Sequence, residues 1–305
     1  MTGRVFLHLG PPKTGTTSVQ MALQQIQSDQ LEYIGVRQPR EAHDNADATV
    51  LLGVCRGNPS VSEAARDLRK KIEAQVKAGS HVVVSEEKFV VANNESEVRE
   101  QIRRIVQFFD GLPTTVIVTL RDPKQALPSF FQEIHARLPL NLRGNFHCFA
   151  DDGRNFCYDY QKLGEFIVAL GVDFHLADFR EISGGAMNVA SLLGPSTIMQ
   201  GQLSDVRANV SSKKHDASAR WIGGVNATDL ASLPTAKLLI DKFGLRRLPG
   251  WKMLGALARR VPLQRARYRK LELDDVQSAK YLASYEAARS RWAPQLPPLK
   301  EDAQA

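Results

Sequence analysis

The chain has 305 residues, which is enough for one large α/β domain or two smaller ones. Hydrophobic residues make up 43% of it and charged residues 24%, which is ordinary for a soluble globular protein. No apolar run approaches the roughly 20 residues that a transmembrane helix needs. The first residues also lack the shape of a signal peptide, so we expect a cytosolic protein.

The net charge of +7 is concentrated in the last third of the chain. Residues 201–305 carry 19 Lys and Arg against 10 Asp and Glu, whereas the first 200 carry 21 against 23. This asymmetry favours an anionic ligand or acceptor near that region, with a solvated helical surface as the alternative. The cysteines, Cys55, Cys148 and Cys157, fit no common zinc motif, and we expect them to be reduced and structural.

Apolar, β-branched runs alternate with helix-like segments along the chain, which is typical of a parallel α/β sheet. We predict strands at 4–9, 81–85, 114–120 and 172–177, and helices at 16–27, 62–78, 95–109 and 274–291. No linker or internal repeat is visible, so we predict one domain over 1–292. Its part from about residue 201 is a basic, helical C-terminal cap, and 293–305 is a mobile tail.

A glycine-containing turn joins the first predicted strand to the first helix, with the sequence GPPKTGTTS at residues 10–18. Such a turn aims several backbone N–H groups at one point, at the positive end of the helix dipole, and this geometry binds phosphate or sulfate. The hydroxyls of Thr16, Thr17 and Ser18 add further donors. The turn predicts a P-loop-type fold, with helices on both faces of a central parallel sheet in three layers.

The details of the turn disfavour an ATP or GTP site, whose loop reads G-x-x-x-x-G-K-[ST]. Gly10 and Gly15 have that spacing, but Thr16 occupies the lysine position. The lysine of this turn, Lys13, would meet a ligand from another side, near the oxygen that bridges phosphate to the transferred group. The later strands lack a clear Asp for a metal, so metal-dependent nucleotide hydrolysis is disfavoured.

A second anion site is expected after the strand at 114–120. Arg121 lies where that strand ends, at the edge of a parallel sheet where ligands collect. Its guanidinium can grip a phosphate with two hydrogen bonds, and Ser129 lies about two helical turns further on. Pro128 can kink this helix and displace Ser129.

Both motifs resemble those of the PAPS-dependent sulfotransferases of the bacterial and carbohydrate type. The turn follows the family's pattern P-K-[ST]-G-T-T-x-[LW] except at Val19, and residues 121–131 follow R-[DN]-P-x5-S-x-[YF]. The resemblance implies that the 5′-phosphosulfate is held by Pro12, Lys13, Thr14, Gly15, Thr16, Thr17 and Ser18. It also implies that Lys13 stabilises the leaving phosphate oxygen, and that Arg121 and Ser129 bind the 3′-phosphate.

A third stretch is similar to the family's R-x-N-x-S element, with Arg207, Asn209 and Ser211 at its defined positions. In that family the element approaches the nucleotide from the side opposite to the phosphate loop. We therefore expect these three residues to contact PAPS, with an ordinary polar loop as the alternative.

Sulfuryl transfer also needs a base near the acceptor. Two glutamates follow the predicted strand at 81–85, and the segment resembles the S-[ST]-E and E-K elements of the family, which align on Glu87. We expect Glu87 to be the general base, with Glu86 as the alternative and Lys88 as a further cation near the donor. Among the histidines, His135 is a rival base, whereas His8 on the first strand is expected to belong to the core.

The sequence therefore predicts a sulfotransferase that uses PAPS, releases PAP and needs no metal. A carboxylate base favours a saccharide or glycolipid hydroxyl, while an amine, a small phenol or an alcohol stays open. The segment 251–261 allows peripheral membrane contact, with core packing as the alternative. The rival hypotheses are a P-loop nucleotide kinase or hydrolase, and a non-enzymatic polyanion-binding protein. No specific nucleic acid is expected, and no oligomeric state is predicted.

Overall fold

The computed structural model describes residues 3–26, 28–180, 193 and 271–293. Two compact units are distinguished among these residues. The first contains residues 3–26, 28–127, 152–180, 193 and 275–293, and the second contains residues 128–151 and 271–274. The first unit contains the sheet. Residues 207, 209 and 211 lie outside the described residues, as does most of the predicted C-terminal cap.

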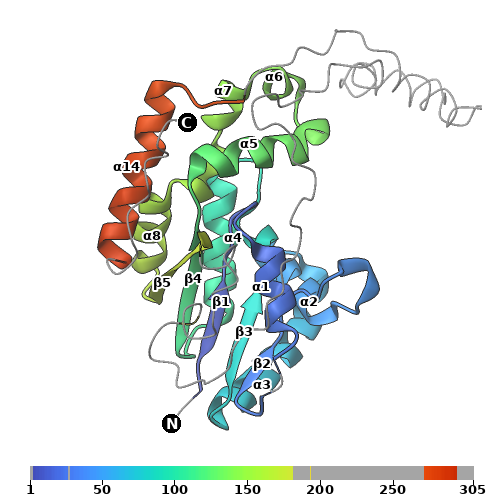
Figure 1. The fold of residues 1–305 in the computed structure, drawn as a ribbon. Coiled ribbons are helices and arrows are strands. Elements are labelled where there is room, and N and C mark those ends of the chain that lie inside the picture. The colour runs from blue at the N-terminus through green and yellow to red at the C-terminus, as the bar shows by residue number, and fades with distance from the viewer. Residues whose placement is uncertain (1–2, 27, 181–192, 194–270, 294–305) are drawn as a thin grey trace, which may run out of the picture. The chain divides into compact units, whose positions relative to one another are not determined.

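Five strands are described: β1 (Val5–His8), β2 (Leu31–Tyr33), β3 (His81–Ser85), β4 (Thr114–Leu120) and β5 (Asp173–Asp178). The α-helices described are α1 (Thr16–Leu23), α2 (Ala46–Cys55), α3 (Ser62–Lys77), α4 (Glu95–Phe108), α5 (Pro123–Ile134), α6 (Leu140–Arg143), α7 (Phe146–Ala150), α8 (Tyr160–Ala169) and α14 (Asp275–Trp292) (Figure 1). Short 3-10 turns are η1 (Arg40–Ala42), η2 (Pro59–Val61), η3 (Glu87–Val90), η4 (His135–Arg137) and η5 (Gly153–Tyr158).

The sheet is parallel throughout, in the order β2-β3-β1-β4-β5. The chain leaves β1 towards β2 on one side, and it later leaves β3 towards β4 on the other side. Because parallel crossovers are right-handed, connections in opposite directions place their helices on opposite faces. The carboxyl end of β1 is therefore a topological switch point, where ligands of open α/β sheets bind.

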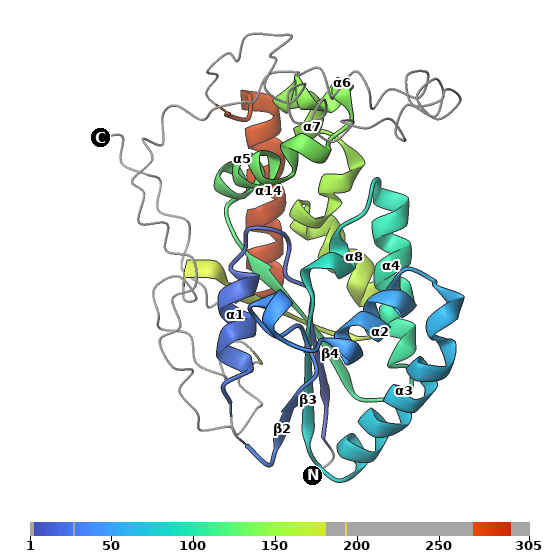
Figure 2. The ribbon, with the colours of Figure 1, turned by 90° about the vertical axis from the view of Figure 1, so that its right-hand side faces the viewer.

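Apolar side chains cover both faces of the sheet. On one face, Val19, Ala22 and Leu23 of α1 pack against Phe6, Val83 and other buried strand residues. Figure 2 shows α1 on this side of the sheet and α2, α3 and α4 on the opposite side. The buried side chains of α4 are Val98, Ile102, Ile105 and Val106, which recur at helical spacing. The protein is thus an α/β protein with an all-parallel, five-stranded sheet flanked by helices.

α14 packs against α8 beside β5, within the unit that contains the sheet. The ring of Trp292 meets that of Phe174 edge-on at 5.2 Å. Gly164 of α8 faces the same indole, and a Cβ at this position would lie 2.6 Å from Trp292. The last described helix therefore belongs to the layer that covers the β5 end of the sheet.

The second unit has its own aromatic cluster. The ring of Phe131 on α5 lies within 5.3 Å of those of Phe146 and Phe149, and all three side chains are buried. The guanidinium of Arg143 donates to two backbone carbonyls, of Ala136 and Leu138, and this holds the turn after α5. The helix α5 continues through Pro128 without a break, so the proline does not end it.

Most of the sequence-based elements agree with the structure to within a residue or two. The strands predicted at 81–85 and 114–120 coincide with β3 and β4, and the helices at 62–78, 95–109 and 274–291 match α3, α4 and α14. The helix predicted at 16–27 ends earlier, at Leu23. The sequence analysis missed β2, α2 and α8, and the short helices α6 and α7. β2 has only three residues, and α2 is apolar over most of its length, so neither shows a clear periodicity.

Candidate functional site

The turn at residues 10–18, which we call the phosphate loop after its predicted role, has an unusual backbone conformation at its centre. Lys13 has φ 64° and Gly15 has φ 83°, both in the left-handed region. A non-glycine residue there costs about 1 kcal/mol, and such strain collects at functional sites. Thr14, between them, fixes the turn, because its hydroxyl donates to the Pro11 carbonyl at 2.7 Å and its N–H at 3.2 Å.

The local geometry of the loop explains its two glycines. Gly15 is the N-cap of α1 and offers no side chain to the N–H groups of the first helical turn, which have no partner within a helix. A Cβ on Gly10 would lie 2.1 Å from Cγ2 of Thr16 and 3.0 Å from the ring of His8. The loop therefore folds directly over the start of α1, and its backbone is close to the helix N-terminus.

Arg121 meets this loop, although 108 residues separate it from Lys13. It follows β4, the neighbour of β1, and its guanidinium donates to the carbonyl of Lys13. The guanidinium carbon also lies 4.4 Å from the centroid of the Phe179 ring, a cation–π distance. The structure thus brings Arg121 of the second sequence motif to the loop of the first, at the carboxyl edge of the sheet.

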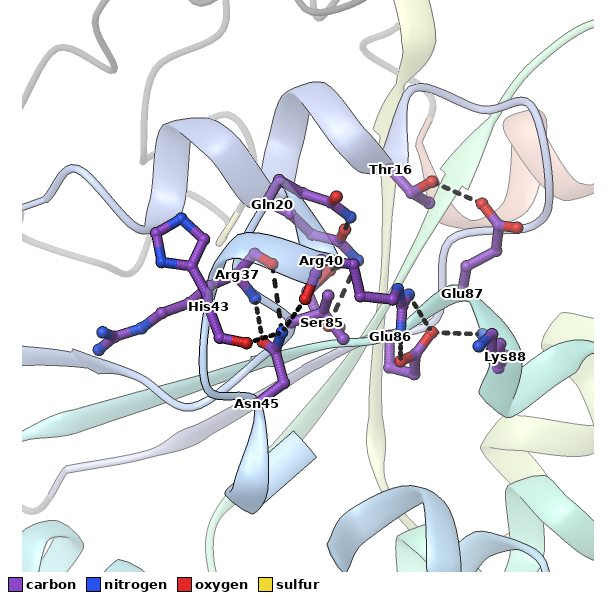
Figure 3. Close-up of polar contacts among 12 residues, drawn as sticks. Thr16, Gln20, Arg37, Arg40, His43, Asn45, Ser85, Glu86, Glu87 and Lys88 are labelled. Carbon is purple, nitrogen blue, oxygen red and sulfur yellow. Dashed lines mark hydrogen bonds and ion pairs between the residues drawn. The ribbon is translucent and has the colours of Figure 1, made fainter. Parts of the chain in front are cut away.

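Glu87 lies beside the start of α1. Thr16 donates its hydroxyl to Oε2 of Glu87 at 2.8 Å, and Figure 3 shows the two side chains pointing toward one another. Glu87 is partly buried and begins the turn η3, directly after β3 and Glu86. Lys88 is exposed. A carboxylate, a hydroxyl and the phosphate loop therefore share one corner of the sheet edge.

Glu86 has a different environment. Its side chain is 1% exposed, and its two oxygens accept hydrogen bonds from the Arg40 guanidinium at 2.9 and 3.1 Å (Figure 3). Oε1 also accepts from the N–H of Lys88 and so caps η3. These contacts raise the pKa of Arg40, chiefly through the hydrogen bond to Glu86. Glu86 orients the turn that carries Glu87, and its carboxylate is already used there.

His8 connects the tips of three strands. Its Nδ1 is 2.8 Å from the hydroxyl of Ser85 on β3, and its Nε2 is 2.7 Å from that of Thr119 on β4. The side chain is fully buried, and the loss of solvation lowers its pKa to about 4. His8 is therefore a neutral, hydrogen-bonded core histidine, as the sequence predicted.

The remaining sequence-predicted residues are placed as follows. Thr17 and Ser18 are partly buried in the first turn of α1. Ser129 is partly buried on α5, in the second unit, whereas Arg121 belongs to the first. His135 lies in η4 of the second unit, with Nε2 3.0 Å from the Arg143 carbonyl. Arg207, Asn209 and Ser211 lie outside the described residues. The roles of these residues stay predictions.

The sequence analysis missed Arg40, Tyr158 and Tyr160. Tyr158 donates its hydroxyl to the Pro12 carbonyl at 2.6 Å. The hydroxyl of Tyr160 donates to the Arg121 carbonyl at 2.9 Å and accepts from the Arg121 N–H at 3.2 Å. No motif marks these residues, because their partners are distant in the sequence: the Glu86 carboxylate for Arg40, and backbone atoms for the two tyrosines.

Two cavities in the sheet-containing unit lie away from this edge. One, of about 660 Å³, is lined mainly by α2, η2 and α3, and the other, of about 310 Å³, lies by the end of α1 and β2. Within the described ranges, no three His, Cys, Asp or Glu side chains gather as a metal site. No helix among the described residues is both long and apolar enough to cross a membrane.

Fold and site together define an α/β protein with a candidate anion site at the carboxyl edge of its parallel sheet. No protein-family model matches the chain, and no curated protein matches its sequence significantly. The assignment of a function therefore depends on the residues of the site and their geometry.

Proposed function

We propose that this protein is a PAPS-dependent sulfotransferase with a P-loop-type nucleotide site, which transfers a sulfuryl group to a hydroxyl or amine acceptor. One observation carries the proposal: Arg121 reaches the phosphate loop at Lys13. A donor with a 5′-phosphosulfate and a 3′-phosphate needs two cationic sites that are close together. Arg121, from the second motif that resembles those of sulfotransferases, contacts the first motif at the topological switch point of the sheet.

The residues of the loop fit the 5′ side of such a donor. Left-handed backbone at Lys13 and Gly15 frames the turn, and α1 begins directly after it. N–H groups at a helix N-terminus suit a phosphate or sulfate group. The absence of a lysine at position 16 separates this loop from that of ATP- and GTP-binding proteins.

PAPS supplies an activated sulfuryl group when it is bound. Lys13 neutralises the charge that develops on the leaving phosphate oxygen, and Thr14 to Ser18 hold the 5′-phosphate through their backbone N–H groups and the hydroxyls of Thr17 and Ser18. Glu87 accepts the proton of the acceptor. The acceptor oxygen forms a bond to sulfur as the bond from sulfur to the phosphate oxygen breaks, and PAP leaves. As in phosphoryl transfer, positioning and electrostatics supply most of the catalysis.

The contact of Thr16 with Glu87 supports the role of Glu87, because it holds the carboxylate beside the loop that carries Lys13. A base must lie within hydrogen-bond reach of the acceptor, and the acceptor must lie beside the sulfuryl group. A carboxylate base leads us to propose a saccharide or glycolipid hydroxyl as the acceptor. A small alcohol or phenol is the alternative acceptor.

A thermal-shift comparison of nucleotides tests the proposal. Adenosine 3′,5′-bisphosphate should raise the melting temperature far more than ATP, with or without Mg²⁺, because a ligand at 100 times its Kd stabilises a fold by about 2.7 kcal/mol. Stronger stabilisation by Mg²⁺-ATP would support a kinase or hydrolase instead. Salt-sensitive polyanion binding that persists in Lys13→Ala would support a non-enzymatic binding protein.

A further inference from the structure

Two buried tyrosines lie behind the two anion-binding segments of the candidate site. Tyr158 is 0% exposed and Tyr160 1% exposed. The hydroxyl of Tyr158 holds the phosphate loop through the Pro12 carbonyl at 2.6 Å. The hydroxyl of Tyr160 holds Arg121 through both its N–H and its carbonyl. One short segment of chain therefore contacts both halves of the site.

These hydroxyls stay protonated. Burial raises the pKa of Tyr158 and of Tyr160 well above the ordinary value for a phenol. Each can therefore donate a hydrogen bond at any working pH, and neither needs to be a base. Their contacts go to backbone atoms, so they fix where the loop and Arg121 lie and do not take part in a proton transfer.

The segment between the two tyrosines is itself anchored. Asp159 accepts a hydrogen bond from the hydroxyl of Ser284 at 2.6 Å, and the same hydroxyl accepts from the N–H of Gln161 at 3.0 Å. The ring of Tyr160 also meets that of Tyr285 edge-on at 6.0 Å. Through Ser284 and Tyr285, α14 holds the segment that carries both tyrosines.

We infer that Tyr158 and Tyr160 are positioning residues that set the distance between the phosphate loop and Arg121. By this role they select a nucleotide with phosphates at both its 3′ and 5′ positions over one with a single phosphate. The inference rests on the proposed function. Two contacts to one ligand increase its affinity together only when their spacing matches the ligand. A misplacement of about 1 Å can remove much of this gain in affinity.

The test compares nucleotide affinities in variants that lack one hydroxyl. Calorimetry would measure binding of adenosine 3′,5′-bisphosphate, adenosine 5′-monophosphate and adenosine 3′-monophosphate to the wild-type protein, Tyr158→Phe and Tyr160→Phe. We expect each variant to bind the bisphosphate about fivefold more weakly, which corresponds to one hydrogen bond of about 1 kcal/mol. Binding of each monophosphate should change less than about twofold. The ratio of the affinity for the bisphosphate to the affinity for a monophosphate should therefore fall.

Tyr33→Phe is the matched control. Its hydroxyl also donates to a backbone carbonyl at 2.6 Å, that of Val36, and it lies on β2 at the edge of the sheet. This variant loses the same kind of bond and should keep the ratio of the wild type. A purely structural role of Tyr158 and Tyr160 would lower all three affinities together or leave all unchanged, and either result would overturn the inference.

Ser284→Ala provides a second route if a tyrosine variant folds poorly. It removes the anchor of Asp159 and Gln161 and leaves both tyrosines in place, so the ratio should fall in the same direction by a smaller factor. A wild-type ratio near one would refute the proposed function and the inference with it. A high wild-type ratio that persists in Tyr158→Phe, Tyr160→Phe and Ser284→Ala would refute the inference alone.

Discussion

Thr16, the first residue of α1, donates its hydroxyl to Oε2 of Glu87 at 2.8 Å. The contact joins the helix that follows β1 to the turn that follows β3, its neighbour in the sheet. Any anion on the first turn of α1 therefore lies beside a carboxylate. That proximity is unfavourable for simple anion binding, and it suits a site that must also remove a proton from an acceptor.

Glu87→Gln should abolish most of the turnover and keep the nucleotide affinity. The amide oxygen can still accept the hydrogen bond from Thr16, so the loop should stay in place. A missing general base typically lowers the rate 10²–10⁴-fold. Steady-state rates with PAPS and calorimetry with adenosine 3′,5′-bisphosphate would measure the two effects separately.

Glu86→Gln is the control for that experiment, and it should affect stability more than chemistry. The change removes the negative charge of a buried side chain that two Arg40 hydrogen bonds hold, so we expect a loss of about 1–3 kcal/mol in the free energy of unfolding. The rate per folded molecule should change little. If Glu86→Gln loses turnover and Glu87→Gln retains it, the base is Glu86.

Lys13→Ala and Arg121→Ala should each weaken binding of adenosine 3′,5′-bisphosphate at least tenfold. A hydrogen bond to a charged group contributes about 1.5–3 kcal/mol, and each variant removes a cation from the same corner of the site. Lys77→Ala, on the exposed last turn of α3, is the matched control and should bind as the wild type does. Unchanged affinity in both site variants would contradict the assignment of two anion sites.

Gly10→Ala should damage the site without a change of charge. The added Cβ would lie 2.1 Å from Cγ2 of Thr16, so the loop or the start of α1 must move. We expect nucleotide affinity to fall about tenfold and stability by about 1–3 kcal/mol, as overpacking usually does. At Gly144 a Cβ meets nothing within 4 Å, so Gly144→Ala should leave nucleotide binding intact. Calorimetry and thermal melts would check both.

His8 should make the protein less stable in mild acid. Its pKa is about 4 in the folded protein against 6.5 for the ordinary side chain. Between these two values the unfolded chain binds a proton that the folded protein does not. The contribution of His8 is therefore fully present above pH 6.5 and is lost progressively as the pH falls to about 4, by about 3 kcal/mol in total.

Denaturant unfolding at pH 7, 5.5 and 4.5 would measure this loss in the wild type and in His8→Gln. The variant cannot titrate at this position, so its stability should fall less steeply over the window. Other titrating groups are common to both proteins and cancel in the comparison. Equal slopes would show that His8 does not titrate as its burial implies.

The local elements of the fold could be predicted from the sequence. Continuous apolar runs identified β3 and β4, and helical spacing identified α3 and α4, because these patterns record which side chains each element buries. The phosphate loop and Arg121 were predicted because each is a short motif at the end of a strand, where local chemistry alone requires glycine, lysine or arginine.

Tertiary structure alone decided how those motifs combine. The strand order puts β1 between β3 and β4, so that Lys13, Glu87 and Arg121 gather at one edge. The fold also places the two adjacent glutamates in different environments. Glu86 is buried against Arg40, whereas Glu87 accepts a hydrogen bond from Thr16. Arg40, Tyr158 and Tyr160 act on partners 39 to 146 residues away. Hydrogen bonds across such separations leave no periodic trace in a sequence, because only the folded chain brings donor and acceptor together.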